Sequence, residues 1–125
     1  MNGWTVDELT KIQAADELQI APRRRDGTLR NPVTIWVVRY GDEVYVRSYR
    51  GSDSFWYRGT KVRHEGHIRA GGIDKDVTFV DEIDSGANEE IDTAYRTKYR
   101  GYGAQYVDPM VAPQARATTI KLVPR

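Results

Sequence analysis

The stretch VTIWVVRYGDEVYVRSY, residues 33–49, decides the fold class of this 125-residue chain. Both halves of the stretch are dense in β-branched and aromatic residues, which favour strands. Between them, Gly41-Asp42 can serve as a two-residue turn. The pattern predicts an antiparallel hairpin made of strands 33–40 and 43–49.

The two-residue turn fixes the register of this hairpin, because each residue before the turn then faces one after it. Three cross-strand pairs on one face follow: Tyr40–Glu43, Val38–Tyr45 and Trp36–Arg47. The other face carries four aliphatic residues: Ile35, Val37, Val44 and Val46. Large apolar groups on both faces suit a closed barrel or a sandwich better than a sheet that is wet on one side.

On the N-terminal side of the hairpin, a capping box predicts a helix over residues 6–15, since Thr5 lies three residues before Glu8. Trp4 and Leu9 have the spacing of a hydrophobic staple at the same helix end. Two further segments are expected before the hairpin: a short strand at 18–20 and a polar loop at 22–32.

On the C-terminal side, Ser54 is expected to cap a short helix through residues 55–57. Asn88 is expected to cap a third helix, whose acidic first turn and basic last turn complement its dipole and which stops at Gly101. The remaining strands are a second hairpin at 67–70 and 76–80 around Gly71-Gly72, and a last strand over 117–123. Together, these elements predict one α+β domain over residues 1–125, a small six-stranded split barrel with about three short flanking helices.

The composition excludes several classes of protein. Nineteen Lys and Arg against 18 Asp and Glu give a net charge of +1, so no charge argument favours nucleic acid or an anionic membrane as a partner. The absence of cysteine excludes disulfides and thiolate metal sites. The first residues do not form a signal peptide and no apolar run is long enough to cross a bilayer, so a cytoplasmic location is expected.

Seven residues in and after the first hairpin form the candidate site: Trp36, Arg47, Ser48, Gly51, Ser52, Trp56 and Arg58. A guanidinium, hydroxyls and a helix N-terminus together make an anion site, and a tryptophan can stack on a planar ring. This set suits a phosphorylated aromatic cofactor. The structural alternative is a cross-strand cation–π pair between Trp36 and Arg47 beside core aromatics, and residue chemistry alone favours that alternative.

No metal site is predicted, and no residue stands out as a catalytic acid or base. His64 and His67, the only histidines, lie three apart in a strand lead-in and would point to opposite faces. Tyr95 and Tyr99 share a helical face with Ile91, which indicates core packing.

Seven segments, in order along nearly the whole chain, resemble the bacterial domain-of-unknown-function family 2255. They are Trp4-Thr5, the Asp26-Gly27 loop, residues 35–39, 45–48, 56–58, 66–68 and 91–99, followed by the strand at 119–124. The resemblance implies a split barrel of the superfamily that includes pyridoxamine phosphate oxidases, flavin reductases and deazaflavin-dependent nitroreductases. Those relatives are commonly homodimers with the cofactor near the subunit interface.

The resemblance also implies cofactor contacts from Arg47, Ser48, Gly51, Ser52 and Trp56, which occupy places similar to a strand-end Ser and a following Gly…Trp segment of the deazaflavin enzymes. The chain departs from the oxidases, because it has no clear counterpart of their longer basic phosphate-binding pattern. FMN or a deazaflavin is therefore the expected cofactor, and a homodimer the expected assembly.

Two functions stay open at this stage. The first is a flavin- or deazaflavin-binding oxidoreductase-like protein that acts on a small molecule, in which Arg47, Ser48 and Ser52 hold phosphate while Trp36 or Trp56 flanks the ring. The second is a cofactor-free barrel that binds a small-molecule ligand or works as a cofactor-independent isomerase or cyclase.

Overall fold

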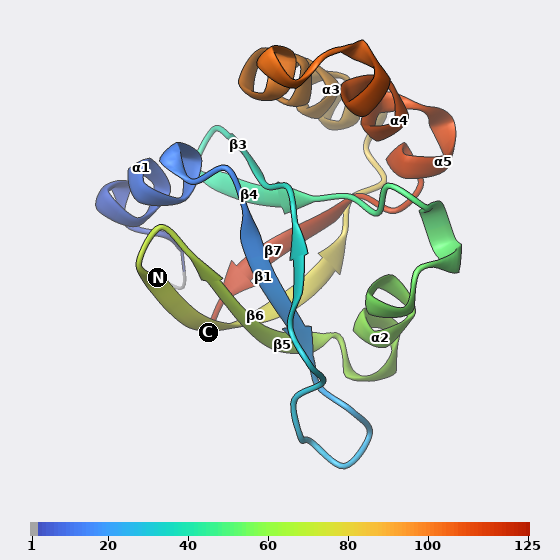
Figure 1. Ribbon diagram of the computed structural model, residues 1–125. Coiled ribbons are helices and arrows are strands. Elements are labelled where there is room, and N and C mark those ends of the chain that lie inside the picture. Colours follow the sequence, from blue (N-terminus) through green and yellow to red (C-terminus); the bar gives the residue numbers. More distant parts are fainter. Residues whose placement is uncertain (1–2) are drawn as a thin grey trace.

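The computed structural model describes residues 3–125, in which one antiparallel sheet of seven strands curls into a half-barrel with five α-helices around it (Figure 1). The strands are β1 Leu18–Pro22, β2 Val33–Ile35, β3 Val38–Tyr40, β4 Glu43–Val46, β5 Glu65–Ala70, β6 Ile73–Asp81 and β7 Ile120–Pro124. The helices are α1 Val6–Ala14, α2 Phe55–Arg63, α3 Ser85–Tyr99, α4 Ala104–Val111 and α5 Pro113–Arg116. The strand order in the sheet is β2-β1-β5-β6-β7-β4-β3.

The sheet has one strand more than predicted, because the segment 33–40 forms two strands and not one. β2 pairs with β1, whereas β3 pairs with β4. These two short strands are therefore the opposite edges of the sheet, and the chain passes from one edge to the other through Trp36-Val37. Because of the break, each edge of the curled sheet is a strand of only three residues, and short edge strands expose few unpaired backbone groups.

Side chains of α3 satisfy the backbone groups at this break. The N–H of Val37 donates to Tyr99 Oη at 3.0 Å, and Lys98 Nζ donates to the carbonyl oxygen of Val37 at 2.8 Å. Val37 is fully buried, so its backbone groups need such partners in place of water. The end of α3 thus replaces the ladder hydrogen bonds that a continuous strand would have made.

The register of the first hairpin is confirmed near the turn and wrong further away. Val38 lies opposite Tyr45 and Tyr40 opposite Glu43, as the two-residue turn requires. Trp36 and Arg47 do not pair, because both strands end before reaching them. The second hairpin turns at Gly71-Gly72 as predicted, with longer strands on both sides.

Two of the three predicted helices begin where the sequence pattern places them. The capping box of Thr5 and Glu8 is present at α1, and Ser54 caps α2, which runs to Arg63 and not only through 55–57. The third helix begins earlier than predicted, because Asp84 and not Asn88 is its cap. Helices α4 and α5 were not predicted; Pro109 lies inside α4 and Pro113 begins α5.

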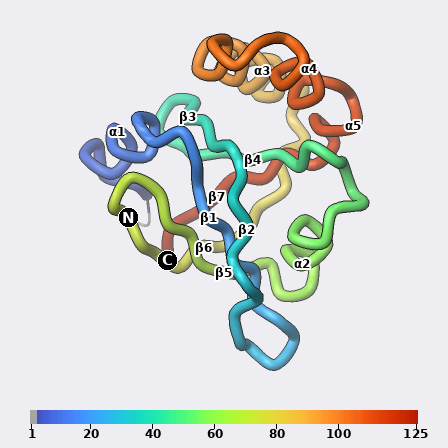
Figure 2. The backbone as a smooth tube through the Cα atoms, in the orientation of Figure 1, coloured from blue at the N-terminus to red at the C-terminus, as the bar shows by residue number. Residues whose placement is uncertain are grey.

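The curled sheet separates two apolar clusters. The larger fills the barrel interior with mainly aliphatic side chains, including Ile20, Ile68 and Leu122. The smaller lies outside the barrel, beneath α3 and α4, and is rich in tyrosine. Figures 1 and 2 show α3, α4 and α5 gathered above one end of the barrel, while the β1–β2 connection projects from the other. No helix within residues 3–125 is long and apolar enough to span a membrane.

Candidate functional site

A groove of about 900 Å³ is the larger of the two concave regions described below. It lies between β2, the chain after β4, the beginning of α2 and helix α4. Its lining comes from residues 33–36, 47–50, 53–56, 105, 106 and 110. Ligand pockets of drug-sized molecules commonly have volumes of about 300–1,000 Å³, so the groove has room for a ligand of two or three fused rings.

Aromatic side chains form much of the lining of the groove. Five of them line it: Trp36, Tyr49, Phe55, Trp56 and Tyr106. Trp56 is buried, whereas Phe55 is 83% exposed and Tyr49 and Tyr106 are each more than half exposed. Trp36 stacks on Tyr99, with ring centroids 3.9 Å apart and an interplanar angle of 1°. The stack holds the indole in one orientation beside the groove.

Arg47 lies at the inner wall of the groove and is 1% exposed. A guanidinium has five N–H donors, and all of them have acceptors within the protein. Nε donates to Thr119 Oγ1 at 2.9 Å. Nη1 donates to Asp92 Oδ1 at 2.5 Å and to the Met110 carbonyl at 2.9 Å. Nη2 donates to the carbonyl and Oδ1 of Asn88.

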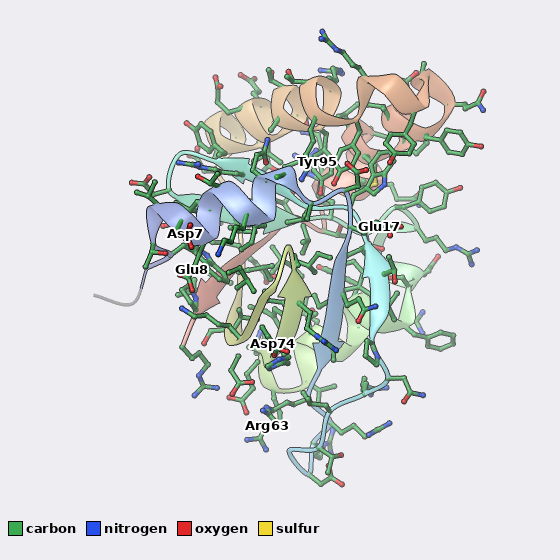
Figure 3. All side chains as sticks on the ribbon, turned by 60° about the vertical axis from the view of Figure 1, so that its left-hand side comes forward. Asp7, Glu8, Glu17, Arg63, Asp74 and Tyr95 are labelled. Atoms are coloured by element: carbon green, nitrogen blue, oxygen red, sulfur yellow. The ribbon has the colours of Figure 1, made fainter. Side chains whose placement is uncertain are left out.

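This network leaves Arg47 with no donor for a phosphate. The network joins the end of β4 to α3 and α4. The guanidinium of Arg47 also lies over the ring of Tyr95, with its Cζ 5.4 Å from the ring centroid. Figure 3 shows Tyr95 between α3 and the barrel. The predicted cation–π pair of Arg47 with Trp36 is absent among the described contacts, since each of the two pairs with a tyrosine of α3 instead.

Ser48 positions the beginning of α2 and does not face the groove freely. Its N–H donates to Thr118 Oγ1 at 2.8 Å, and its hydroxyl donates to Ser54 Oγ at 2.8 Å. Ser54 Oγ in turn accepts the N–H of Tyr57 and so caps the helix. The fully buried Ser48 therefore sets where the first turn of α2 meets the groove.

The structure brings four of the seven predicted site residues to the groove: Trp36, Arg47, Ser48 and Trp56. Gly51, Ser52 and Arg58 do not line it. Gly51 has φ +69° and lies so close to Gln114 that a Cβ would clash, while Arg58 is exposed, donates to the Ser52 carbonyl and pairs with Asp53 at 3.6 Å.

Sequence reasoning missed several lining residues, chiefly those of α4. Tyr106 and Met110 belong to a helix that the proline-containing segment did not suggest. Tyr49 and Phe55 belong to the predicted strand and the predicted helix. Their exposure, which the structure shows, distinguishes them from core aromatics.

Burial shifts the titration of groups around the Trp36–Tyr99 stack. Partial burial lowers the pKa of Lys98 from 10.5 to about 8, with an opposing effect of the Asp16 carboxylate. Burial also raises the pKa of the Tyr95 and Tyr99 hydroxyls above the ordinary tyrosine value. Burial therefore shifts the titration of all three groups towards the neutral form, and Lys98 still carries its charge at neutral pH.

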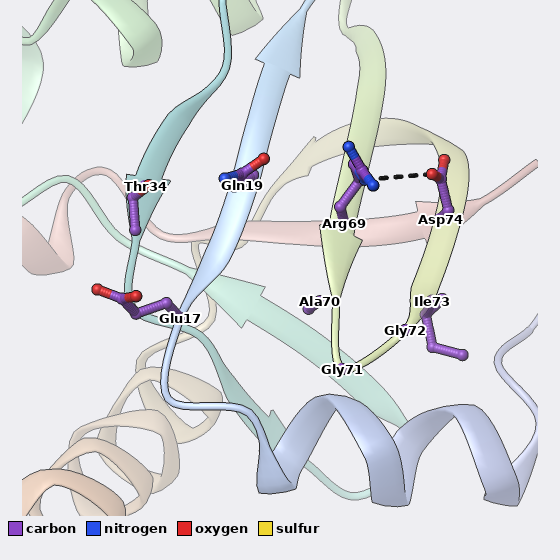
Figure 4. Close-up of a pocket in the computed structure, with 9 residues that line it drawn as sticks. All are labelled: Glu17, Gln19, Thr34, Arg69, Ala70, Gly71, Gly72, Ile73 and Asp74. Carbon is purple, nitrogen blue, oxygen red and sulfur yellow. Dashed lines mark ion pairs between the residues drawn. The ribbon is translucent and has the colours of Figure 1, made fainter.

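A second concave region, of about 430 Å³, lies on the outer face of the sheet near the β5–β6 turn (Figure 4). It is lined mostly by polar side chains, and the Arg69–Asp74 ion pair at 3.2 Å crosses it. None of the seven predicted residues belongs to it. His67 lies beside it between Asp74 and Asp76, and residues 3–125 contain no cluster of three or more His, Cys, Asp or Glu arranged to hold a metal ion.

The family described as "Uncharacterized protein conserved in bacteria (DUF2255)" matches residues 8–122. The chain belongs to this family. No curated protein matches its sequence significantly.

Solved structures with similar folds place this member of the family among the split barrels. The heme storage protein HutZ of Vibrio cholerae is 17% identical, with a TM-score of 0.62, over 93% of this chain and 86% of that one. An F420-H2-dependent reductase, FDR-A, is also 17% identical with a TM-score of 0.62, over 86% of this chain and 93% of that one. A conserved hypothetical protein of Mycobacterium tuberculosis is 10% identical with a TM-score of 0.63, over 98% of this chain and 81% of that one. The predicted split-barrel fold is confirmed.

Proposed function

We propose that the groove binds FMN or a deazaflavin and that the chain works as a flavin- or deazaflavin-dependent oxidoreductase acting on a small molecule. The observation that carries the proposal is the aromatic groove of about 900 Å³ beside the rigid Trp36–Tyr99 stack. The split-barrel fold supports it, because similar structures include F420-dependent reductases.

The aromatic residues fit a planar tricyclic ring. Trp36, already fixed against Tyr99, offers a flat surface, and offset stacking of aromatic rings contributes about 0.5–1.5 kcal/mol beyond burial. Trp56 and Met110 supply further apolar contacts. The bound cofactor would supply the hydride, while the protein orients the ring and excludes water. Arg47 has a positioning role in this proposal, because its donors hold Asp92 and Asn88.

The absorbance spectrum of the purified protein and calorimetric titration with FMN and with F420 test the proposal. Saturable binding of one of them, weakened by Trp36→Ala and retained in Trp36→Phe, is the expected result, since phenylalanine preserves a flat ring on Tyr99. Absence of binding for both ligands at high micromolar concentration contradicts the proposal.

A second candidate function follows from the saturated guanidinium of Arg47. Since Arg47 is paired with Asp92 and the exposed Arg58 lies near Asp53, neither predicted arginine offers a free phosphate site in the groove. The groove would then bind an apolar small molecule without a flavin, as a binding protein or a cofactor-independent enzyme. Binding of uncharged aromatic compounds with no measurable affinity for FMN or F420 would favour this function.

We also propose that the chain forms a homodimer that covers the rim of the groove. Exposed Tyr49, Phe55 and Tyr106 form an apolar rim, and aromatic residues are enriched in interfaces. One structure with a similar fold, 18% identical over 86% of this chain and 79% of that one, with a TM-score of 0.62, is described as a domain-swapped dimer. Light scattering at tens of micromolar is expected to report a dimer that Phe55→Ser weakens; a monomeric wild-type chain contradicts this.

A further inference from the structure

Arg50 is an exposed arginine that lines the groove and makes no ion pair or side-chain hydrogen bond within residues 3–125. It belongs to the segment Ser48-Tyr49-Arg50-Gly51, in which the N–H of Gly51 donates to the Ser48 carbonyl at 3.0 Å. This hydrogen bond closes a β-turn with Tyr49 and Arg50 at its central positions. Arg50 has φ −90° and ψ 8°, the values of the third residue of a type I turn, in which serine is common at the first position and glycine at the last.

Both ends of this turn are fixed by packing. Ser48 is fully buried and is hydrogen-bonded through both its N–H and its hydroxyl. Gly51 is also buried, and a Cβ there would lie 2.4 Å from Gln114 Cγ. The two central residues, Tyr49 and Arg50, are exposed and both line the groove. The turn thus presents an aromatic ring and a cation to the groove on a backbone that other elements hold in place.

The charge of Arg50 is not compensated by the rest of the lining. Besides Arg47, whose donors are all used, the lining contains one other charged residue, Asp53. The carboxylate of Asp53 lies 3.6 Å from Nη2 of Arg58, which is outside the groove. A guanidinium presents its N–H donors in a planar fork that matches the oxygens of a phosphate or a carboxylate. Arg50 is therefore the lining arginine whose donors are available to an anionic group of a ligand.

The charges behind the groove favour an anion as well. Arg47 Nη1 lies 2.5 Å from Asp92 Oδ1, and Arg116 Nε lies 3.3 Å from Asp92 Oδ2. Two guanidiniums thus share one carboxylate, and these three groups together carry an excess of positive charge. A cleft whose walls carry one sign of charge raises the local concentration of ligands of the opposite sign. The inner wall therefore adds attraction at a distance, although Arg47 has no donor left for contact.

We propose that Arg50 forms the anion subsite of the groove and binds the phosphate or carboxylate group on the tail of the bound ligand. The inference rests on the proposed function, in which the ring system lies against Trp36. Trp36 follows β2, whereas Arg50 lies in the chain after β4, so the ring and the tail contact different segments of the lining. The ligand class is a planar aromatic molecule with an anionic tail, and its anion contact is Arg50 in place of Arg47 or Arg58.

Titrations with paired ligands test the subsite, because the two members of each pair share the ring and differ by the anionic tail. The pairs are FMN with riboflavin, and F420 with the same deazaflavin lacking its phosphorylated tail. The wild-type protein should bind the anionic member of a pair more tightly, and added salt should weaken that member only. Arg50→Gln should weaken the anionic member about 10-fold, as expected for one hydrogen bond between charged groups in an exposed position, and leave the other unchanged. Its melting temperature should equal that of the wild type, because the exposed Arg50 has no partner to lose within the described residues.

Arg25→Gln is the matched control, since Arg25 is also exposed and also without an ion pair within residues 3–125, but lies outside the groove. It should leave every affinity unchanged. Three results overturn the subsite and leave flavin or deazaflavin binding standing: equal affinity of the wild type for both members of a pair, equal weakening of both members by Arg50→Gln, or an Arg50→Gln variant that behaves like Arg25→Gln. If no member of either pair binds, the proposed function and the subsite are overturned together.

Discussion

The interior of the barrel and the region beneath α3 and α4 are stabilised in different ways. The interior is filled mainly by aliphatic side chains whose contacts are non-directional. The region under the helices combines tyrosines with the buried Arg47–Asp92 ion pair and the hydrogen bonds at Val37. A substitution that removes a polar group beneath α3 and α4 should therefore lower stability more than a conservative substitution in the barrel interior. The region beneath the helices also positions the groove.

The largest expected effect is that of Arg47→Ala. Removal of the guanidinium leaves Asp92 without its closest cation and several buried acceptors unsatisfied, which should lower the free energy of unfolding by about 3–5 kcal/mol. Chemical denaturation measures it. The control, Arg58→Ala, removes an exposed arginine that lies outside the groove and should leave stability unchanged. If Arg47→Ala is as stable as Arg58→Ala, the network is not structural.

Tyr99→Phe should have an intermediate effect. The variant keeps the ring stacked on Trp36 but removes the acceptor for the buried Val37 N–H, which should lower the unfolding free energy by about 1–3 kcal/mol. Ile20→Val in the barrel interior is the comparison, with an expected loss of about 0.5–1.5 kcal/mol. A Tyr99→Phe variant with wild-type stability would show that Val37 has another partner.

Lys98 should give a pH dependence of stability in a defined window. Its pKa is lowered by burial to about 8 in the folded chain from 10.5, so between these values the unfolded state binds the additional proton. The free energy of unfolding contributed by Lys98 therefore rises as pH increases from about 8 towards 10.5. The difference between the wild-type and Lys98→Met unfolding curves, measured from pH 7 to 9.5, should show this rise. A difference that stays constant contradicts it.

The smallest expected effect is that of His67 on the outer face. Although partial burial disfavours its charged form, hydrogen bonds to Asp76 and Asp74 raise its pKa above the ordinary value of 6.5. Its stabilising contribution is then complete below pH 6.5 and lost as pH rises through the raised value. His67→Gln should lower the melting temperature slightly at pH 6 and less at pH 9. An equal loss at both pH values contradicts this assignment.

The same comparison shows which features the sequence could predict. The two hairpin turns and the caps at Thr5 and Ser54 depend on neighbouring residues, and these predictions are confirmed. The division of segment 33–40 depends on which distant strands it pairs with. No local pattern contains that information, so the seventh strand was missed.

Long-range contacts also explain what was missed in the candidate site. The acceptors around Arg47 come from positions 41 to 72 residues away, so the residue looked like a free anion ligand at a strand end. Trp36, Ser48 and Trp56 line the groove because they lie within two residues of β3, of β4 or of the beginning of α2, which are parts of the predicted hairpin and helix. The contribution of α4 was hidden by Pro109, which usually indicates the end of a helix.

Amide NMR spectra of the isotope-labelled protein during titration with FMN and with F420 test the central claim most directly. The account predicts that resonances of residues 33–36, 47–50, 53–56, 105, 106 and 110 shift and saturate together. Resonances of the outer-face region at 69–74 should stay in place. Shifts confined to residues 69–74, or no shifts with either ligand at high micromolar concentration, would contradict the assignment of the groove as a flavin or deazaflavin site.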